Sequence, residues 1–337
     1  GLLTPPSTLI SILALALSAT FAWVIRKSQP VIAFGILLFL AGHVMESTFI
    51  PLELTFEHRN YLPSVGLITI VFYYLLKPNK SNIINNAVTA LCITMIAISG
   101  SSTYMRSLDW SNNIRLITTE VTNHPNAPRS NYEMGKLHGQ ALERGTINTE
   151  LHYEKAREYF IKATDARDNF TAGLFGLILA TIDANKKVDP EWINELEYRL
   201  QHTAYEQVNT LWLRSYARCV HTGNCNAEVI GVERLFNAAA RNPTVSNRSK
   251  GILYSVISDY ELRVNRDLDK AIHYAERAVT VSPRNVEFRI RYTQLLVVSG
   301  KIDSAQKSIE IAKALDVNLL YSDRIQKLRK HIVQKRK

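Results

Sequence analysis

Charged residues are scarce in the first third of the chain. Residues 1–103 contain five Lys or Arg and three acidic residues, whereas the remaining residues are densely charged. The charged residues of this part are Arg26, Lys27, Glu46, Glu53, Glu57, Arg59, Lys77 and Lys80. A soluble domain covers its surface with charge, so this scarcity argues against a chain that lies wholly in water. The division predicts that one part of the protein faces lipid and the other faces water.

A basic nucleic-acid-binding motif is also missing. The formal net charge is +10, but seven basic residues fall within the last fourteen, RIQKLRKHIVQKRK. No basic motif is interleaved with aromatic residues, so we expect no nucleic-acid partner. The basic tail, residues 321–337, fits either a frayed and solvated helix end or a contact with anionic membrane lipids.

Several motifs of enzymes and metal proteins are absent. The chain contains no glycine-rich phosphate loop, no HExxH and no GxSxG, and its three cysteines include no CxxC pair. No cofactor or zinc site is therefore evident, and the sequence leaves a divalent metal open. The chain opens without Met, and its first apolar run lacks a basic start and a cleavage site. We expect no signal peptide, and instead the C-terminal part of a longer membrane protein.

Long apolar runs predict a membrane domain over residues 1–103. The run at 8–25, TLISILALALSATFAWVI, has eighteen residues without a charge. At about 1.5 Å per residue it nearly spans a bilayer core of about 30 Å. Three further transmembrane helices are predicted at about 31–47, 62–76 and 84–99, and the last two are short.

The positive charges between these helices predict their orientation. Arg26 and Lys27 join the first two helices, and Lys77 and Lys80 join the last two. Because short cytoplasmic loops are enriched in Lys and Arg, both loops should be cytoplasmic. The outer loop, residues 43–63, and everything after residue 100 would then lie in the periplasm or in a lumen. The protein would be integral to a bacterial inner membrane or to the endoplasmic reticulum membrane.

Two cysteines bear on the compartment. Cys219 and Cys225 bracket VHTGN, and six residues across a glycine-containing turn allow a small disulfide loop in an oxidising compartment. Two unrelated thiols are the alternative. Cys92 falls inside the predicted fourth helix.

After residue 130 the pattern is helical and repeats. AIHYAERAVTVSP places small residues at Ala271 and Ala278, and AQKSIEIAKALDV repeats them 34 residues later at Ala305 and Ala312. A 34-residue period of this kind resembles the tetratricopeptide repeat, in which alanines let the two helices of each unit approach closely. Weaker copies, AREYFIKATDARD and GVERLFNAAARNP, lie upstream.

These observations predict an all-α protein. Transmembrane helices would be followed by a linker helix at 104–130 and by a tetratricopeptide-like solenoid at 131–320, with about five irregular units. Repeats of this kind form concave surfaces that bind extended or helical peptides, so an acceptor protein or peptide in the groove is an expected partner.

The outer loop carries an unusual set of polar residues. His43 and Glu46 are three residues apart, so they share a helix face if the second helix extends that far. Ionisable groups at membrane depth are usually functional or paired. A plain alternative is a membrane-surface turn in which Tyr61 is an interfacial anchor.

A family resemblance covers residues 40–140. FEHRNYLPSVG resembles a Glu-Arg-x-x-Tyr-Leu-Pro-Ser-x-Gly segment of GT-C glycosyltransferases with C-terminal tetratricopeptide repeats, the TMTC-type O-mannosyltransferases and their bacterial relatives. The matching residues are Glu57, Arg59, Tyr61, Leu62, Pro63, Ser64 and Gly66. A second segment resembles the link into that family's repeats, through Arg106, Trp110, Leu116, Pro125, Asn126, Arg129, Asn131 and Gly135. Tyr132 and Met134 depart from the family's small and Leu residues.

The resemblance implies sugar transfer from a polyprenyl-phosphate carrier to a protein hydroxyl on the non-cytoplasmic side. It also implies that the catalytic acids lie upstream of this chain, so no catalytic residue is assigned here. Arg59 would hold the lipid-linked phosphate, because a guanidinium is a permanent, forked cation. His43, His58 and Tyr61 would donate further hydrogen bonds, and Glu57 would orient Arg59.

Two other functions fit the sequence. An O-oligosaccharide ligase of the WaaL/PglL type would use His43, Glu46 and Arg59 on an undecaprenyl-linked glycan. A membrane-anchored scaffold would use the membrane helices only to hold a peptide-binding repeat domain at the membrane.

Overall fold

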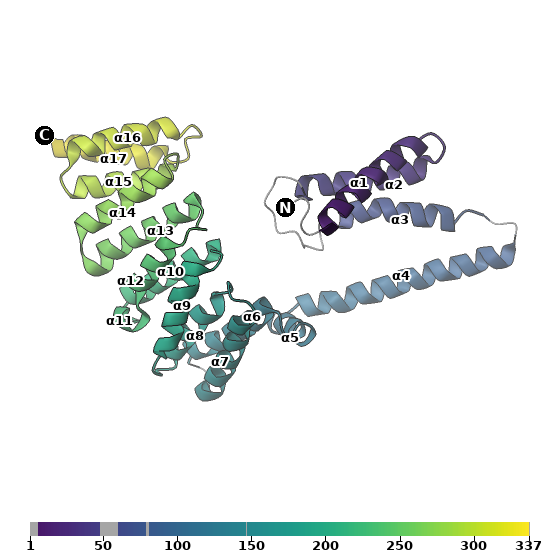
Figure 1. The fold of residues 1–337 in the computed structure, drawn as a ribbon, viewed down its shortest axis with the longest axis horizontal. Helices are drawn as coiled ribbons and strands as arrows, with labels where there is room; N and C mark the ends of the chain where they lie inside the picture. Colours follow the sequence, from purple (N-terminus) through teal and green to yellow (C-terminus); the bar gives the residue numbers. More distant parts are fainter. Residues whose placement is uncertain (1–5, 48–59, 79–80, 146, 337) are drawn as a thin grey trace. The chain divides into compact units, whose positions relative to one another are not determined.

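A computed structural model describes residues 6–47, 60–78, 81–145 and 147–336 of the chain. Every regular element in these ranges is a helix, which confirms the all-α prediction. The chain divides into two compact units, residues 1–108 and 109–337. Figure 1 shows the helices of each unit.

The first unit contains four helices that match the apolar runs. They are α1 Pro6–Ile25, α2 Pro30–Ser47, α3 Tyr61–Leu75 and α4 Asn82–Trp110. Two of them, α1 from Ser7 onward and α4, are long and apolar enough to cross a membrane. Their large side chains point outward, since Leu17 is 68% exposed and Ile96 is 65% exposed.

Helices α2 and α3 pack through glycines. A Cβ atom on Gly66 would lie 2.3 Å from the carbonyl oxygen of Gly35, and one on Gly35 would lie 2.4 Å from the carbonyl oxygen of Gly66. A second close approach joins Gly42 to Pro63. Glycines let helix backbones come this near, which favours van der Waals packing between membrane helices. No side chain fits at either of the first two positions without moving a helix.

Helix α4 is longer than its apolar core. The predicted fourth span ends at residue 99, but the helix continues through SGSSTYMRSLDW to Trp110, because this stretch holds no proline. The linker helix predicted at 104–130 is consequently divided. Its first part belongs to α4, and a separate helix, α5 Asn113–Asn123, begins where the side chain of Asn112 accepts a hydrogen bond from the Ile114 amide at 2.8 Å.

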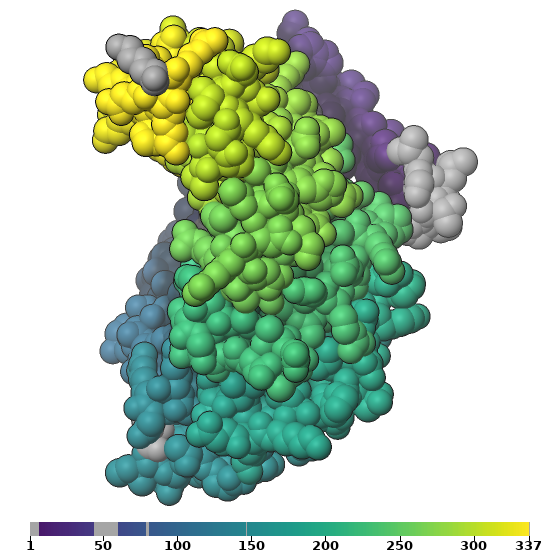
Figure 2. All heavy atoms as spheres, turned by 90° about the vertical axis from the view of Figure 1, so that its left-hand side faces the viewer, coloured from purple at the N-terminus to yellow at the C-terminus, as the bar shows by residue number. Residues whose placement is uncertain are grey.

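The second unit is a succession of packed helices. After α5 come α6 Pro128–Glu143, α7 Thr149–Asp165, α8 Ala172–Asp183, α9 Pro190–His202, α10 Gln207–His221, α11 Ala227–Ile230, α12 Val232–Arg241, α13 Asn247–Tyr260, a π-helix Glu261–Asn265, α14 Leu268–Val281, α15 Val286–Val298, α16 Ile302–Leu315 and α17 Ser322–Arg336. In Figure 2 their colours follow one another as bands, so neighbours in sequence are neighbours in space.

Helix ends in this unit follow short-range signals. Asp189, Ser246, Asp267 and Asn285 each accept a backbone hydrogen bond at a helix start. Prolines stand two residues beyond the ends of α12 and α14, where they prevent the helix from continuing. These signals cut the chain into consecutive pairs, among them α6 with α7, α13 with α14 and α15 with α16.

The repeated alanines lie in the second helices of pairs, α7, α14 and α16, and in α12, which packs against α9. Those at the periodic positions are at most 2% exposed: Ala156, Ala163, Ala238, Ala271, Ala278, Ala305 and Ala312. Large side chains fill the space between pairs, with Phe175, Leu213 and Tyr216 fully buried in the central cluster. Small residues thus set the spacing within a pair, and large ones fill the core between pairs.

The basic tail is the helix α17, which packs against α15 and α16. Its residues Ile325 and Ile332 are 2% and 0% exposed. Residues 322–336 are therefore a packed helix and not a frayed end, although most of its side chains are solvated, as that interpretation expected. The apolar face closes the end of the second unit, while most of the basic side chains stay at the surface.

Candidate functional site

The outer-loop residues are only partly described. Glu57, His58 and Arg59 lie outside the described residues, so their predicted roles stay predictions. Glu46 lies in α2, as the shared helix face requires, but its side chain is also outside the described part. Tyr61 is the first residue of α3 and is 67% exposed.

His43 lies one turn from the end of α2. Its ring meets the ring of Phe39 edge to face, with centroids 4.8 Å apart. The adjacent residue, Gly42, is the one that contacts Pro63. This contact holds the end of α2 that carries His43 against the start of α3 that carries Tyr61. His43 and Tyr61, eighteen positions apart in sequence, therefore lie on the two helix ends that approach each other at Gly42 and Pro63.

The same packing sorts the segment FEHRNYLPSVG into two kinds of residue. Pro63 and Gly66 are buried and contact Gly42 and Gly35 of α2, so helix packing accounts for them. Tyr61 and Leu62 are exposed and have no packing role of this kind. Sequence reasoning missed this difference because it treated the segment as one motif, although Gly35 and Gly42 were a visible signal for a close helix contact.

Cys219 and Cys225 form a disulfide, with Cα atoms 5.2 Å apart. The bond closes the turn between α10 and α11, and both Asn224 and Cys225 donate backbone hydrogen bonds to the carbonyl oxygen of Cys219. Cys92 is a free, buried cysteine of α4. A disulfide of this kind persists in oxidising compartments.

A histidine pair lies between α6 and α7. The Nδ1 atoms of His138 and His152 are 3.0 Å apart, so one ring donates the hydrogen and the other accepts it. Burial lowers the pKa of His138, and the nearby His152 and Lys155 lower it further. No three His, Cys, Asp or Glu side chains gather in the described part of the chain as a metal site would require.

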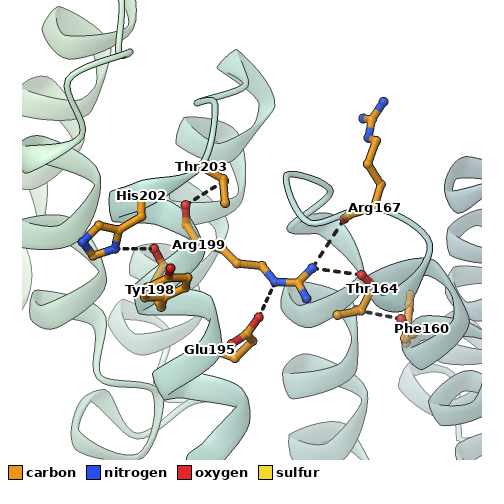
Figure 3. A network of polar contacts seen from close by, with 8 residues as sticks. All are labelled: Phe160, Thr164, Arg167, Glu195, Tyr198, Arg199, His202 and Thr203. Carbon is orange, nitrogen blue, oxygen red and sulfur yellow. Dashed lines mark hydrogen bonds and ion pairs between the residues drawn. The ribbon is translucent and has the colours of Figure 1, made fainter.

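A buried arginine joins two helix pairs (Figure 3). Arg199 of α9 is 9% exposed, and its Nη1 donates to the carbonyl oxygens of Thr164 at 2.9 Å and Arg167 at 3.4 Å. Its Nε donates to Glu195 at 2.6 Å. Carbonyl oxygens at the end of α7 and the Glu195 carboxylate thus accept the hydrogen bonds of the Arg199 guanidinium. Arg199 is therefore a structural link and offers no free charge to a ligand.

A similar link connects the next pair. The side-chain nitrogen of Asn242 donates to the carbonyl oxygens of Leu200 and Thr203, both at 2.8 Å. Asn242 is 1% exposed. Arg199 thus ties α9 to the end of α7, and Asn242 ties the end of α12 to the end of α9. Sequence reasoning missed both links because their partners are distant backbone atoms.

No protein-family model matches this chain, and no curated protein matches it.

Proposed function

We propose that this chain is the C-terminal part of a membrane glycosyltransferase. It would move a sugar from a polyprenyl-phosphate carrier to a protein on the non-cytoplasmic side of the membrane, while the helix pairs, as tetratricopeptide-like repeats, recruit the acceptor. The observation that carries the proposal is the segment FEHRNYLPSVG, residues 56–66, at the start of α3.

The packing of α2 on α3 supports a fixed site at this place. The Gly42–Pro63 contact holds His43 and Tyr61 at the same end of the two helices. Arg59 is two residues before Tyr61 in sequence and lies outside the described residues, so we propose its place from the sequence alone. A guanidinium there suits a lipid-linked phosphate at the head-group plane.

The direct test replaces Arg59 in the full-length protein and measures glycosylation of secreted proteins by mass spectrometry. Arg59→Ala should lower transfer by about tenfold or more, because it removes charge-assisted hydrogen bonds to the phosphate. Arg59→Lys should retain part of the activity, since Lys keeps the charge but loses the fork. Lys77→Ala, predicted on the opposite face, is the matched control. Unchanged glycosylation in Arg59→Ala would refute the role of this residue.

The proposed topology has four spans, with the second unit outside the cytoplasm. The basic loops at 26–27 and 77–80 support this orientation. Reporter fusions at Asn79 and Asn131 test it. A periplasmic or lumenal signal from Asn131 and a cytoplasmic one from Asn79 are expected, and the reverse pattern would contradict the proposal.

A second candidate function is a membrane-anchored scaffold that binds a protein partner. Consecutive helix pairs with buried alanines, such as α13 with α14 and α15 with α16, favour it. The Arg59→Ala variant distinguishes the two functions. A scaffold would keep its partner and its cellular effect in this variant, whereas the transferase would lose activity.

A further inference from the structure

A cavity of about 250 Å³ lies between α10 and α13, which pack against each other. One face of α10 contributes Arg214, Arg218 and His221, which are spaced by three or four residues. Asp259 and Tyr260 line it from the end of α13, and Arg263 does so from the π-helix that follows. Six side chains from α10, α13 and the π-helix therefore surround one opening.

The charge in this cavity is unbalanced. Arg214, Arg218 and Arg263 are exposed and form no ion pair with any residue that the structure describes. The one acid of the lining, Asp259, is already paired with Arg291 of α15. Three guanidinium groups around one opening repel one another, so the arrangement favours an anion that enters between them.

The backbone at Arg263 is unusual. Glu261–Asn265 form a π-helix, in which one turn holds an extra residue, and such turns frequently occur at functional sites. The side-chain nitrogen of Asn265 holds the turn by donating to Glu261 at 2.9 Å and to Glu233 of α12 at 3.0 Å. The chain then leaves through Arg266, whose φ of 54° is left-handed. Arg263 is therefore presented to the cavity by a specifically stabilised backbone.

The disulfide constrains the other side of the opening. Cys219 directly follows Arg218, and the bond to Cys225 closes the turn that starts near His221. This cross-link restricts the end of α10, so the backbone that carries Arg218 and His221 is constrained before a ligand arrives. Pre-organised donors lose less entropy on binding.

We propose that the cavity between α10 and α13 binds the carboxylates of an acidic peptide segment. Arginine side chains pair with carboxylates through two parallel hydrogen bonds, and several of them select for a run of Asp or Glu. The apolar part of the lining, Ala217, Val256 and Val264, contacts the peptide between its charges. The proposal deepens the proposed function, because it gives the chemistry of the recruited acceptor, and it rests on that function only for the biological role of binding.

The test measures binding of a fluorescein-labelled Ser/Gly peptide with a run of Glu to the whole chain in detergent micelles. The same peptide with Gln in place of Glu is the reference ligand. We expect saturable binding of the Glu peptide, at least about tenfold tighter than the Gln peptide, and weaker binding as salt is raised. Failure of the Glu peptide to bind more tightly than the Gln peptide would overturn the proposal.

Paired variants locate the site. Arg218→Gln with Arg263→Gln should weaken the Glu peptide by about tenfold or more, because two charge-assisted contacts are lost. Arg241→Gln with Arg284→Gln removes the same charge from two exposed arginines outside the cavity and should leave binding unchanged. An equal loss in both pairs would show that binding follows net charge alone, and it would overturn the site. Circular dichroism checks that all variants are folded.

Two competitors identify the anion. Free glutamate should displace the peptide at a lower concentration than inorganic phosphate does, and the opposite order would overturn the peptide proposal in favour of a phosphate ligand. Peptide binding is measured without sugar transfer. Intact binding with no glycosylation activity would therefore refute only the proposed enzyme, whereas active transfer with no binding would refute only this site.

Discussion

The two units of the chain differ in where they place large apolar side chains. In the described part of residues 1–108 the buried residues are small or compact: Ala22, Ala33, Gly35, Pro63, Gly66 and Cys92. In residues 109–337 the fully buried side chains include Phe175, Leu213 and Tyr216. Leucines and isoleucines of the first unit are instead exposed, as at Leu17 and Ile96.

This contrast fits a first unit in lipid and a second unit in water. In water, burying large apolar side chains drives folding, so the second unit places them inside. Lipid tails are as apolar as leucine, so helices in a membrane gain little by hiding leucine and gain more from close backbone packing. The first unit has the second pattern. Exposed large apolar side chains beside a close glycine contact are therefore the pattern that a membrane environment would favour.

The largest expected effect tests the second unit. Leu213→Ala removes a fully buried side chain from the central cluster and should lower the free energy of unfolding by about 2–5 kcal/mol. Leu211→Ala, two residues earlier and 52% exposed, is the matched control and should change it by less than about 0.5 kcal/mol. Far-ultraviolet circular dichroism during denaturation measures both. Equal effects would contradict the assigned core.

In the first unit the test adds a side chain at a close helix contact and does not remove one from a core. Gly66→Leu forces a side chain into the carbonyl oxygen of Gly35 and should destabilise the α2–α3 pair by about 1–3 kcal/mol. Val65→Leu also adds volume, but Val65 is 48% exposed, so this control should be tolerated. Limited proteolysis of the chain in lipid vesicles compares the two. Faster cleavage in Val65→Leu than in Gly66→Leu would overturn the packing argument.

The disulfide provides a third, intermediate test. Replacing both Cys219 and Cys225 by Ser should lower the stability of the second unit by about 2 kcal/mol, because the unfolded chain regains the freedom of a short loop. A thiol reductant should lower the melting temperature of the unmodified chain and leave the double variant unchanged. A reductant effect that persists in the double variant would assign it to another cause.

The smallest effect is a pH dependence at the histidine pair. Because burial first, then His152 and Lys155, lower the pKa of His138, the folded state resists a proton that the unfolded chain accepts below pH 6.5. The free energy of unfolding should therefore be highest above pH 6.5. It should decline as pH falls from 6.5, the unfolded-state pKa, to the lower folded-state pKa of His138. His138→Gln should flatten this part of the melting-temperature profile, whereas His202→Gln, at an exposed position, should not.

Much of the second unit was predictable from the sequence. The 34-residue spacing of Ala271 and Ala305 identified second helices of pairs, because close helix packing demands a small residue at a fixed place. The end of α4 was not predictable from hydropathy, because apolarity stops near residue 99 while the helical backbone continues. A helix ends where its hydrogen bonds end, and this need not coincide with the edge of an apolar run.

The candidate sites were less predictable. Gly42 was a visible signal for a close helix contact, but only the fold identifies Pro63 of α3 as its partner. Arg218 and Arg263 are 45 residues apart and belong to different helix pairs, so their common cavity has no local sequence signal. Nothing in the sequence marks Arg199 as buried, yet its guanidinium donates to the carbonyl oxygen of Thr164, 35 residues earlier. Sites formed by side chains from separate helices become visible only when helix spacing and rotation are known.

The π-helix at residues 261–265 makes the cavity depend on the length of the chain as well as on its side chains. Each residue of an α-helix turns the chain by about 100° about its axis, and a π-turn absorbs one residue of surplus. Deleting Leu262 would return this stretch to α-helical register and turn Arg263 to another side of the helix. Deletion of this one residue would therefore change the ligand preference of the proposed site, although every side chain that lines the cavity remains in the sequence.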